Sequence, residues 1–154
     1  MDALHTVSTS SPMGPLQVSE RSGSIVRVTW GAEVEAAPTP LLEEALSQLK
    51  AYFDGRLTVF DLPLAPRGSP FQQSVYAQLR AIPFGETRTY GQLAENLESF
   101  GQPVGQACGS NTIAVIIPCH RMLSAHGTGG FSAIGGVETK IELLRHEDSY
   151  PYLL

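Results

Sequence analysis

The sequence has few cysteines and no long apolar run, and both absences narrow the kind of protein it encodes. Its 154 residues include two cysteines, Cys108 and Cys119, too few for a disulfide framework and consistent with a reducing compartment. No apolar run approaches the roughly 18 residues that a membrane span needs. The stretch from Met1 to Ser10 is polar and lacks the basic-then-apolar layout of a signal peptide. We therefore expect a soluble, cytoplasmic protein with no membrane partner.

Positive charge is also scarce. Lys and Arg number 10 against 15 Asp and Glu, which gives a formal net charge of −5. Nonspecific binding to nucleic acid depends on Lys and Arg neutralising phosphates, so this balance argues against strong binding of that kind. Asp and Glu are absent from Ser99 to Val137, where Arg121 is the only Lys or Arg. A surface built from this stretch would be nearly neutral and could approach a polyanion without strong repulsion.

What the chain does contain is enough apolar material for a core, with 42% hydrophobic and 16% charged residues. We expect strands over residues 5–10, 16–21 and 25–30, and a helix that begins at Thr39-Pro40 and stops at Gly55. Residues 61–69 contain two prolines and a glycine and read as a linker. The pattern predicts an α+β protein with an N-terminal domain over 1–67 and a helix-rich C-terminal domain over 68–154.

Capping boxes predict where two helices of the second domain begin. One is Ser69-Pro70-Phe71-Gln72, whose helix should reach Ile82, and the other is Thr89-Tyr90-Gly91-Gln92. A third helix is expected from Pro103 to about Gly109. Two short helices joined by a Gly-containing turn outline a helix-turn-helix, but any packed pair of helices gives the same outline.

The expected third helix is unusual for a DNA reader because it carries no Arg or Lys for contacts to guanine. Its small residues, such as Gly105 and Ala107, permit close backbone approach. That approach could be to a minor groove or simply to another helix of the same domain.

A cysteine and a histidine follow the most apolar run of the chain. Residues 113–117 are expected to form a buried strand that Pro118 ends. Cys119, His120 and Arg121 come next. A strand that delivers a thiol and an imidazole to its end can hold a nucleophile rigidly. A cysteine after an apolar run is also often a small buried hydrophobic side chain, so the pair alone leaves both interpretations open.

One wider pattern favours the nucleophile. Asn111 precedes Ile116-Ile117-Pro118-Cys119-His120-Arg121, and the supporting segments are Phe71-Gln72-Gln73, Phe84-Gly85-Glu86, Tyr90-Gly91-Gln92-Leu93-Ala94 and Leu143-Leu144-Arg145-His146-Glu147. Together they resemble the O6-alkylguanine-DNA alkyltransferases, the methylated-DNA–protein-cysteine methyltransferases. The resemblance covers nearly all of residues 69–147 and extends more weakly to the first part. It implies a ribonuclease-H-like sheet domain followed by a winged-helix-like domain.

The resemblance also implies a function, DNA repair by direct reversal in a single turnover. The lesion would be flipped out of double-stranded DNA, and its alkyl group would pass irreversibly to Cys119. The main substrate would be O6-methylguanine, with O4-methylthymine as a further candidate. The chain would act as a monomer and would need no cofactor and no metal.

The roles that the resemblance implies fall on specific residues. His120 would take the thiol proton through a water, Glu147 would orient His120, and Tyr90 would hydrogen-bond the base. The other implied positions are Met122, Ser132 and Phe131 in the base pocket, Gln102, Pro103, Gly105 and Gln106 against DNA, and Asn111 and Arg121 in structural roles.

The chain departs from the family pattern at several positions. Gln102 stands where the family usually has an arginine that fills the gap left by the flipped base. Phe131 replaces a pocket tyrosine, and Ala133 and Ile134 are inserted before two glycines. Gln102 and the acidic pI keep a second function open, a sensor that binds alkyl lesions without efficient transfer. A third, a cysteine hydrolase that uses Cys119 and His120, is disfavoured because no third member of a triad and no oxyanion loop can be assigned.

Overall fold

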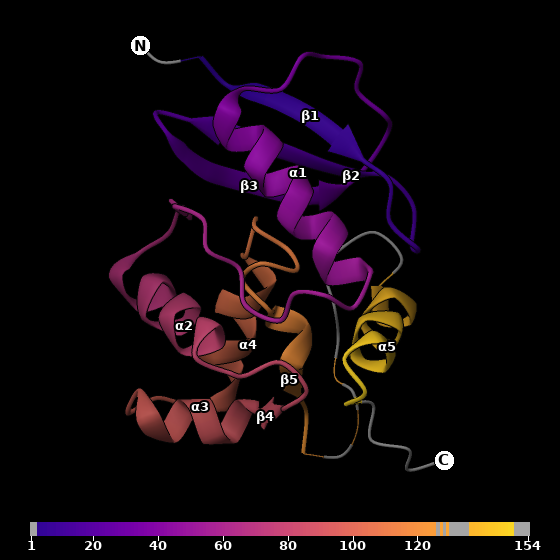
Figure 1. Cartoon of the computed structure of the whole chain (residues 1–154). Coiled ribbons are helices and arrows are strands. Elements are labelled where there is room, and N and C mark those ends of the chain that lie inside the picture. Colours follow the sequence, from indigo (N-terminus) through magenta and orange to yellow (C-terminus); the bar gives the residue numbers. More distant parts are fainter. Residues whose placement is uncertain (1–2, 126, 128, 130–135, 150–154) are drawn as a thin grey trace. The chain divides into compact units, whose positions relative to one another are not determined.

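The computed structural model describes residues 3–125, 127, 129 and 136–149 (Figure 1). The chain forms two compact units, residues 1–67 with 112–116 and residues 68–111 with 117–154. Within the described residues, no helix is long and apolar enough to cross a membrane.

The first unit is a three-stranded sheet covered by one helix. Strands β1 (His5–Thr9), β2 (Leu16–Arg21) and β3 (Ser24–Trp30) pair antiparallel in that order. Helix α1 (Pro40–Phe53) lies across the sheet in Figure 1. Thr39 caps it, because its side chain accepts a hydrogen bond from the Leu42 amide at 3.2 Å. The predicted strands and helix of this region are confirmed, and their apolar faces form the core of the unit.

Two further segments pair with β3. The Ile25 amide donates to the Pro63 carbonyl at 2.8 Å and the Ala65 amide donates to the Ile25 carbonyl at 2.9 Å. Part of the predicted linker therefore extends the sheet. Residues 112–116 return to the same strand, where the Val28 amide donates to the Thr112 carbonyl at 2.9 Å.

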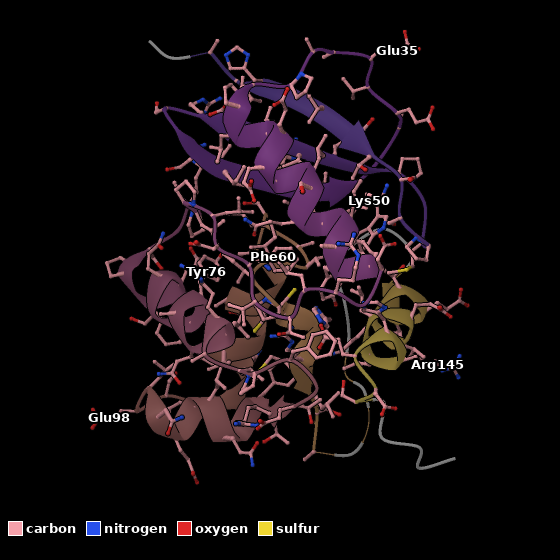
Figure 2. All side chains as sticks on the ribbon, in the orientation of Figure 1. Glu35, Lys50, Phe60, Tyr76, Glu98 and Arg145 are labelled. Atoms are coloured by element: carbon pink, nitrogen blue, oxygen red, sulfur yellow. The ribbon has the colours of Figure 1, made fainter. Side chains whose placement is uncertain are left out.

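The second unit is mainly helical. Its helices are α2 (Pro70–Arg80), α3 (Tyr90–Asn96), α4 (Gly101–Gly109) and α5 (Gly136–His146). A 3₁₀ turn, η1 (Cys119–Arg121), leads into β5 (Met122–Leu123), which pairs in parallel with β4 (Arg88–Thr89). Both predicted capping boxes are confirmed, at Ser69 with Gln72 and at Thr89 with Gln92. Figure 2 shows the Arg145 side chain pointing outward from α5.

Two local predictions in this part of the chain were wrong. Helix α4 begins at Gly101, so that Pro103 lies inside its first turn, where a missing amide proton costs little. The predicted strand over 113–117 is a buried turn. The Ile116 amide donates to the Ala114 carbonyl at 2.7 Å, and Val115 between them has φ +69°. This is a γ-turn with positive φ, a conformation that an apolar run does not reveal.

Candidate active site

Cys119 begins the 3₁₀ turn η1 directly after a second tight turn. Pro118 has φ −83° and ψ 66°, and the Cys119 amide donates across it to the Ile117 carbonyl at 2.8 Å. These angles are those of an inverse γ-turn, which suits the fixed φ of proline. Cys119 as a whole residue is partly exposed, although residues 113–118 before it are buried. The turn thus holds the thiol rigidly at the edge of a buried segment.

Asn111 fixes the position of this turn. Its Nδ2 donates to the Ile117 carbonyl at 2.9 Å and to Cys119 Sγ at 3.3 Å. The backbone amide of Asn111 donates to the Cys108 carbonyl at the end of α4, at 3.2 Å. One residue therefore joins the end of α4, through its backbone, to the γ-turn and the thiol, through its side chain.

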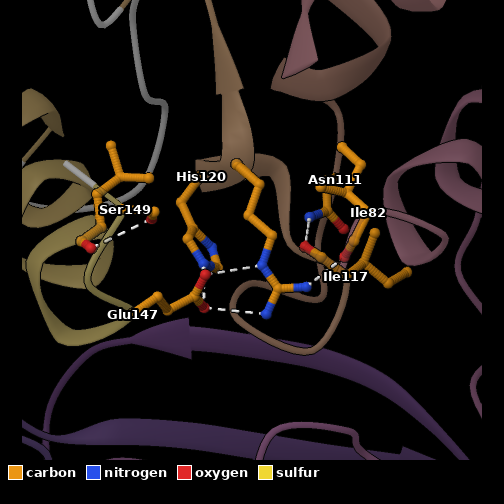
Figure 3. Close-up of polar contacts among 8 residues, drawn as sticks. Ile82, Asn111, Ile117, His120, Glu147 and Ser149 are labelled. Carbon is orange, nitrogen blue, oxygen red and sulfur yellow. Dashed lines mark hydrogen bonds and ion pairs between the residues drawn. The ribbon is translucent and has the colours of Figure 1, made fainter. Parts of the chain in front are cut away.

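Behind the thiol lies a buried group of three ionisable side chains. His120 Nε2 lies 2.8 Å from Glu147 Oε2, and both side chains are fully buried (Figure 3). Arg121 binds the same carboxylate twice, from Nε to Oε1 at 2.8 Å and from Nη2 to Oε2 at 3.0 Å. Its Nη1 donates to the Ile82 carbonyl at 2.7 Å. This bidentate geometry is the strongest form of an Arg–carboxylate contact.

The charge state of this group follows from burial and from these hydrogen bonds. Burial alone would raise the pKa of Glu147, but the hydrogen bonds from His120 and Arg121 and the charge of Arg121 outweigh it and hold the pKa well below its usual range. Burial lowers the pKa of His120 despite the neighbouring carboxylate, so its imidazole is neutral at pH 7. Since Glu147 is ionised and can only accept, Nε2 carries the imidazole proton and donates it.

This tautomer leaves the other ring nitrogen of His120 as a base. Nδ1 is buried and has no hydrogen-bond partner within the described residues. Burial also raises the pKa of the Cys119 thiol, although the Asn111 hydrogen bond and the charge of Lys140 partly oppose that shift. A thiol that is protonated at neutral pH must lose its proton before it can attack. The site places an unprotonated nitrogen on the residue next to that thiol.

Lys140 is a component of the site that sequence reasoning missed. It belongs to α5, is fully buried, and its Nζ lies 6.0 Å from the centre of the Tyr90 ring, at the limit for a cation–π contact. Burial lowers its pKa to about 8, and the two cysteines partly oppose that shift. One signal was present in the sequence: Lys140 lies three and four residues before Leu143 and Leu144, on the buried face of the helix.

Tyr90 is held at the start of α3 by several close neighbours. β4 ends at Thr89 and pairs with β5, so Tyr90 follows directly from the strand beside the active-site segment. A Cβ built on Gly101 or Gly105 would lie 3.8 or 3.9 Å from its side chain, so α4 also packs against it. A Cβ on Gly129 would lie 3.2 Å from its ring, and Gly129 has φ +71°, so only glycine suits that position. Burial raises the pKa of Tyr90 to about 12, with a smaller effect of the cysteines.

The remaining predicted site residues are separated into different surroundings. Met122 is fully buried in β5. On α4, Gln102 and Gln106 are exposed, while Pro103 and Gly105 are half-buried. Phe131 and Ser132, together with the predicted insertion at Ala133 and Ile134, lie outside the described residues. The structure therefore brings together Cys119, His120 and Glu147 through η1 and α5, with Asn111, Arg121 and Tyr90 around them.

A supported thiol, a buried His–Glu pair and a helical unit with two capped short helices define a class, that of cysteine-dependent group-transfer proteins. Residues 70–149 match the family model for the DNA-binding domain of 6-O-methylguanine DNA methyltransferase, and residues 4–66 match its ribonuclease-like domain. The chain belongs to the 6-O-methylguanine DNA methyltransferase family.

Similar proteins cover nearly the whole chain. A methylated-DNA–protein-cysteine methyltransferase of Methanosarcina acetivorans is 40% identical over 150 residues, which span 90% of this chain and 95% of the relative. The crystal structure of the Mycobacterium tuberculosis O6-methylguanine methyltransferase superposes with a TM-score of 0.82 at 35% identity, covering 99% of this chain and 97% of the other. A structure of the M. tuberculosis protein in complex with DNA gives a TM-score of 0.82 at 36% identity, with 96% of each chain covered. The predicted family and fold class are confirmed.

Proposed function

We propose that this chain repairs alkylated double-stranded DNA by transferring the alkyl group of O6-alkylguanine, mainly O6-methylguanine, to Cys119 as a monomer that reacts once. Family membership and the DNA complex of the M. tuberculosis relative support this class of reaction. For this chain, the observation that carries the proposal is the buried hydrogen-bond chain from Arg121 through Glu147 to His120, the residue next to the partly exposed residue Cys119.

Proton transfer is the first step of the proposed reaction. His120 Nδ1 accepts the proton of Cys119 Sγ through a bridging water, while Nε2 keeps its bond to Glu147. The imidazolium that forms is stabilised by the Glu147 carboxylate, which Arg121 holds in place from the other side. The Asn111 amide group donates to Sγ and favours the thiolate over the thiol. The thiolate then attacks the alkyl carbon, forming the S–C bond as the C–O6 bond breaks.

Stabilising the departing guanine is the second requirement, because the base leaves with a negative charge. Tyr90 keeps its phenolic proton at neutral pH and can donate it as a hydrogen bond to the base. The Lys140 Nζ lies 6.0 Å from the centre of the Tyr90 ring, and its positive charge also acts on Cys119. In the proposed reaction Met122, Phe131 and Ser132 bind the base, and Gln102, Pro103, Gly105 and Gln106 bind DNA.

Mass spectrometry after reaction with defined DNA tests the proposal. The protein is mixed with a duplex oligonucleotide that carries one O6-methylguanine, and both the intact mass and the Cys119 peptide are measured. We expect one methyl group per protein molecule, on Cys119. Cys119→Ala should abolish the gain in mass. The matched control Cys108→Ala should keep it, because Cys108 is buried and burial raises its pKa to about 12.

Other outcomes identify other functions. Binding to the lesion without a gain in mass would support a sensor, for which the uncharged exposed side of α4 is the motivating observation. Turnover of a thioester or ester substrate, with DNA left unchanged, would support a cysteine hydrolase.

A further inference from the structure

We infer that Phe100 is the side chain that enters the DNA base stack at the position the lesion base vacates. This inference rests on the proposed function. It adds a residue that positions the substrate and that lies outside the Cys119 site.

Phe100 is a large apolar side chain that the fold leaves in solvent. Four large hydrophobic side chains are exposed in the described part of the chain: Leu4, Val59, Phe100 and Val137. Phe100 is the most exposed of them, at 79%, and the only aromatic one. Phe is among the residue types most often buried, and a single exposed apolar side chain is not by itself a site. The position of Phe100 beside the candidate active site is what distinguishes it from the other three.

The backbone on both sides of Phe100 is fixed. Before it, the Ser99 amide donates to the Ala94 carbonyl at 2.8 Å, and Glu98 adopts a left-handed conformation with φ +51°. After it, the Phe100 carbonyl accepts the first helical bond of α4, from Val104 at 3.4 Å. Phe100 itself occupies the N-cap position in extended conformation, and its side chain makes no capping bond. The ring therefore projects from a rigid corner between α3 and α4.

This corner lies next to the candidate active site. Gly101, the next residue, packs on Tyr90, where an added Cβ would lie 3.8 Å from Tyr90 Cβ. The close approach continues one turn later at Gly105, at 3.9 Å from the ring. Tyr90 is proposed to bind the flipped base, and Gly101 and Gly105 of α4 lie against Tyr90. Phe100 is the residue directly before Gly101.

The chemistry of base flipping calls for such a group. Removing a base from the duplex leaves its neighbours unstacked, and apolar wedges such as Phe or Leu can take the vacated space. A phenyl ring stacks on any base because every base has a π-face. The exposed residues of α4 that follow, Gln102 and Gln106, are uncharged and polar and offer no comparable flat surface. Phe100 is thus the described residue of this corner that can replace a stacked base.

Rates of methyl transfer on two substrates test the inference. One is a duplex with a central O6-methylguanine, and the other is a single-stranded trinucleotide with the same lesion, where no duplex gap forms. We expect Phe100→Ala to slow transfer on the duplex by about tenfold or more, the value of one lost base–aromatic stack. The rate on the trinucleotide should not change. Phe100→Leu should recover much of the duplex rate, because it keeps an apolar wedge.

Val59→Ala is the matched control, since Val59 is 76% exposed and belongs to the other unit. It should leave both rates unchanged. Circular dichroism of each variant reports whether it is folded.

The outcomes separate the inference from the proposed function. Absence of Cys119 methylation in the wild type on both substrates would contradict the proposed function itself. A wild type that reacts and a Phe100→Ala variant with the same duplex rate would overturn only the inference. Equal slowing on both substrates would also overturn it, because Phe100 would then support the fold or the pocket. A loss of self-association in sedimentation with unchanged transfer would identify Phe100 as a contact between two copies of the chain.

Discussion

Glu147 holds two buried partners at once, and replacing it by Gln should destabilise the second unit strongly. Gln keeps the size of Glu but removes the negative charge. It cannot accept from Arg121 on two oxygens and from His120 as well. The Arg121 side chain is only 7% exposed, so water cannot replace the lost acceptor. Removing one partner of a buried ion pair costs about 3–5 kcal/mol. The lower end, about 3 kcal/mol, applies here because the Gln carbonyl can still accept one hydrogen bond.

Chemical denaturation at neutral pH, followed by circular dichroism, measures this loss. With the usual urea dependence for a small domain, about 3 kcal/mol moves the midpoint by roughly 1–3 M. The matched control is Glu142→Gln on α5, the helix that ends directly before Glu147. Glu142 lies 3.9 Å from Arg145, and both side chains are more than half exposed. Such a pair contributes about 0–1 kcal/mol, so the control should stay close to the wild type.

The pH dependence of this difference follows from the lowered pKa of Glu147. A carboxyl group whose pKa is lower in the folded state stabilises the fold at pH values above its unfolded pKa, about 4.5 here. That contribution is lost as the pH falls below this value toward the folded pKa. The gap in stability between wild type and Glu147→Gln should therefore narrow on acidification. An equal gap at about pH 3 and pH 7, or no gap at pH 7, would refute the assignment of Glu147 as an ionised buried partner.

The same variant should also lose activity, because an amide no longer enforces the tautomer of His120. Conversion of a triad carboxylate to an amide can reduce the rate by as much as about 10⁴-fold. Methyl transfer should be measured under conditions where circular dichroism shows the variant to be folded. A folded Glu147→Gln variant that transfers methyl at the wild-type rate would remove Glu147 from the proton path.

Three other changes test separate parts of the site. Asn111→Ala removes the donor to Cys119 Sγ, so methyl transfer should slow by about 10- to 100-fold, with the rate-versus-pH profile displaced to higher pH; an undisplaced profile would mean that Asn111 does not favour the thiolate. Lys140→Met removes a buried cation, so methyl transfer should slow. The stability of the wild type should rise between about pH 8 and pH 10.5, where the unfolded state binds more protons than the folded state, and the variant should lack this rise. Lys50→Met, a change at the other lysine of the chain, which is exposed, should alter neither the transfer rate nor this pH dependence. Gln102→Arg adds a cation to the exposed side of α4 and should raise the transfer rate on duplex DNA, and a slower or unchanged reaction would show that charge at this position is not limiting.

The helices could be predicted from the sequence because their signals are local. Thr39, Ser69 and Thr89 each cap a helix three residues before their hydrogen-bond partner, and the cap geometry depends on those few residues alone. Lys140 shows the opposite case. A lysine is expected in solvent, and only the packing of α5 against η1 and Tyr90 makes it a buried charge. No sequence pattern within α5 predicts which other segments will pack against its apolar face.

The segment before Cys119 shows why an apolar run predicts burial better than it predicts conformation. All residues from Ile113 to Ile117 are buried, as a buried strand would be. Ile113 does make a strand-like bridge with Val28, but Val115 has a positive φ, which a β-branched residue rarely adopts. Only contacts remote in sequence can hold such a residue, and β3 supplies them through its hydrogen bonds to residues 112 and 114.

Two turns in succession have a consequence for the chemistry. A straight strand through residues 113–117 would continue in one direction, at a rise of about 3.3 Å per residue, and would carry Cys119 away from Asn111. The γ-turns at Val115 and Pro118 instead fold the chain back within a few residues, so that Asn111 reaches both the Ile117 carbonyl and Cys119 Sγ. The side-chain amide of Asn111 therefore holds the turn through the Ile117 carbonyl and also donates to the thiol. Cys119 is positioned by the shape of the turn, and the apolar side chains before it serve to keep that strained turn buried.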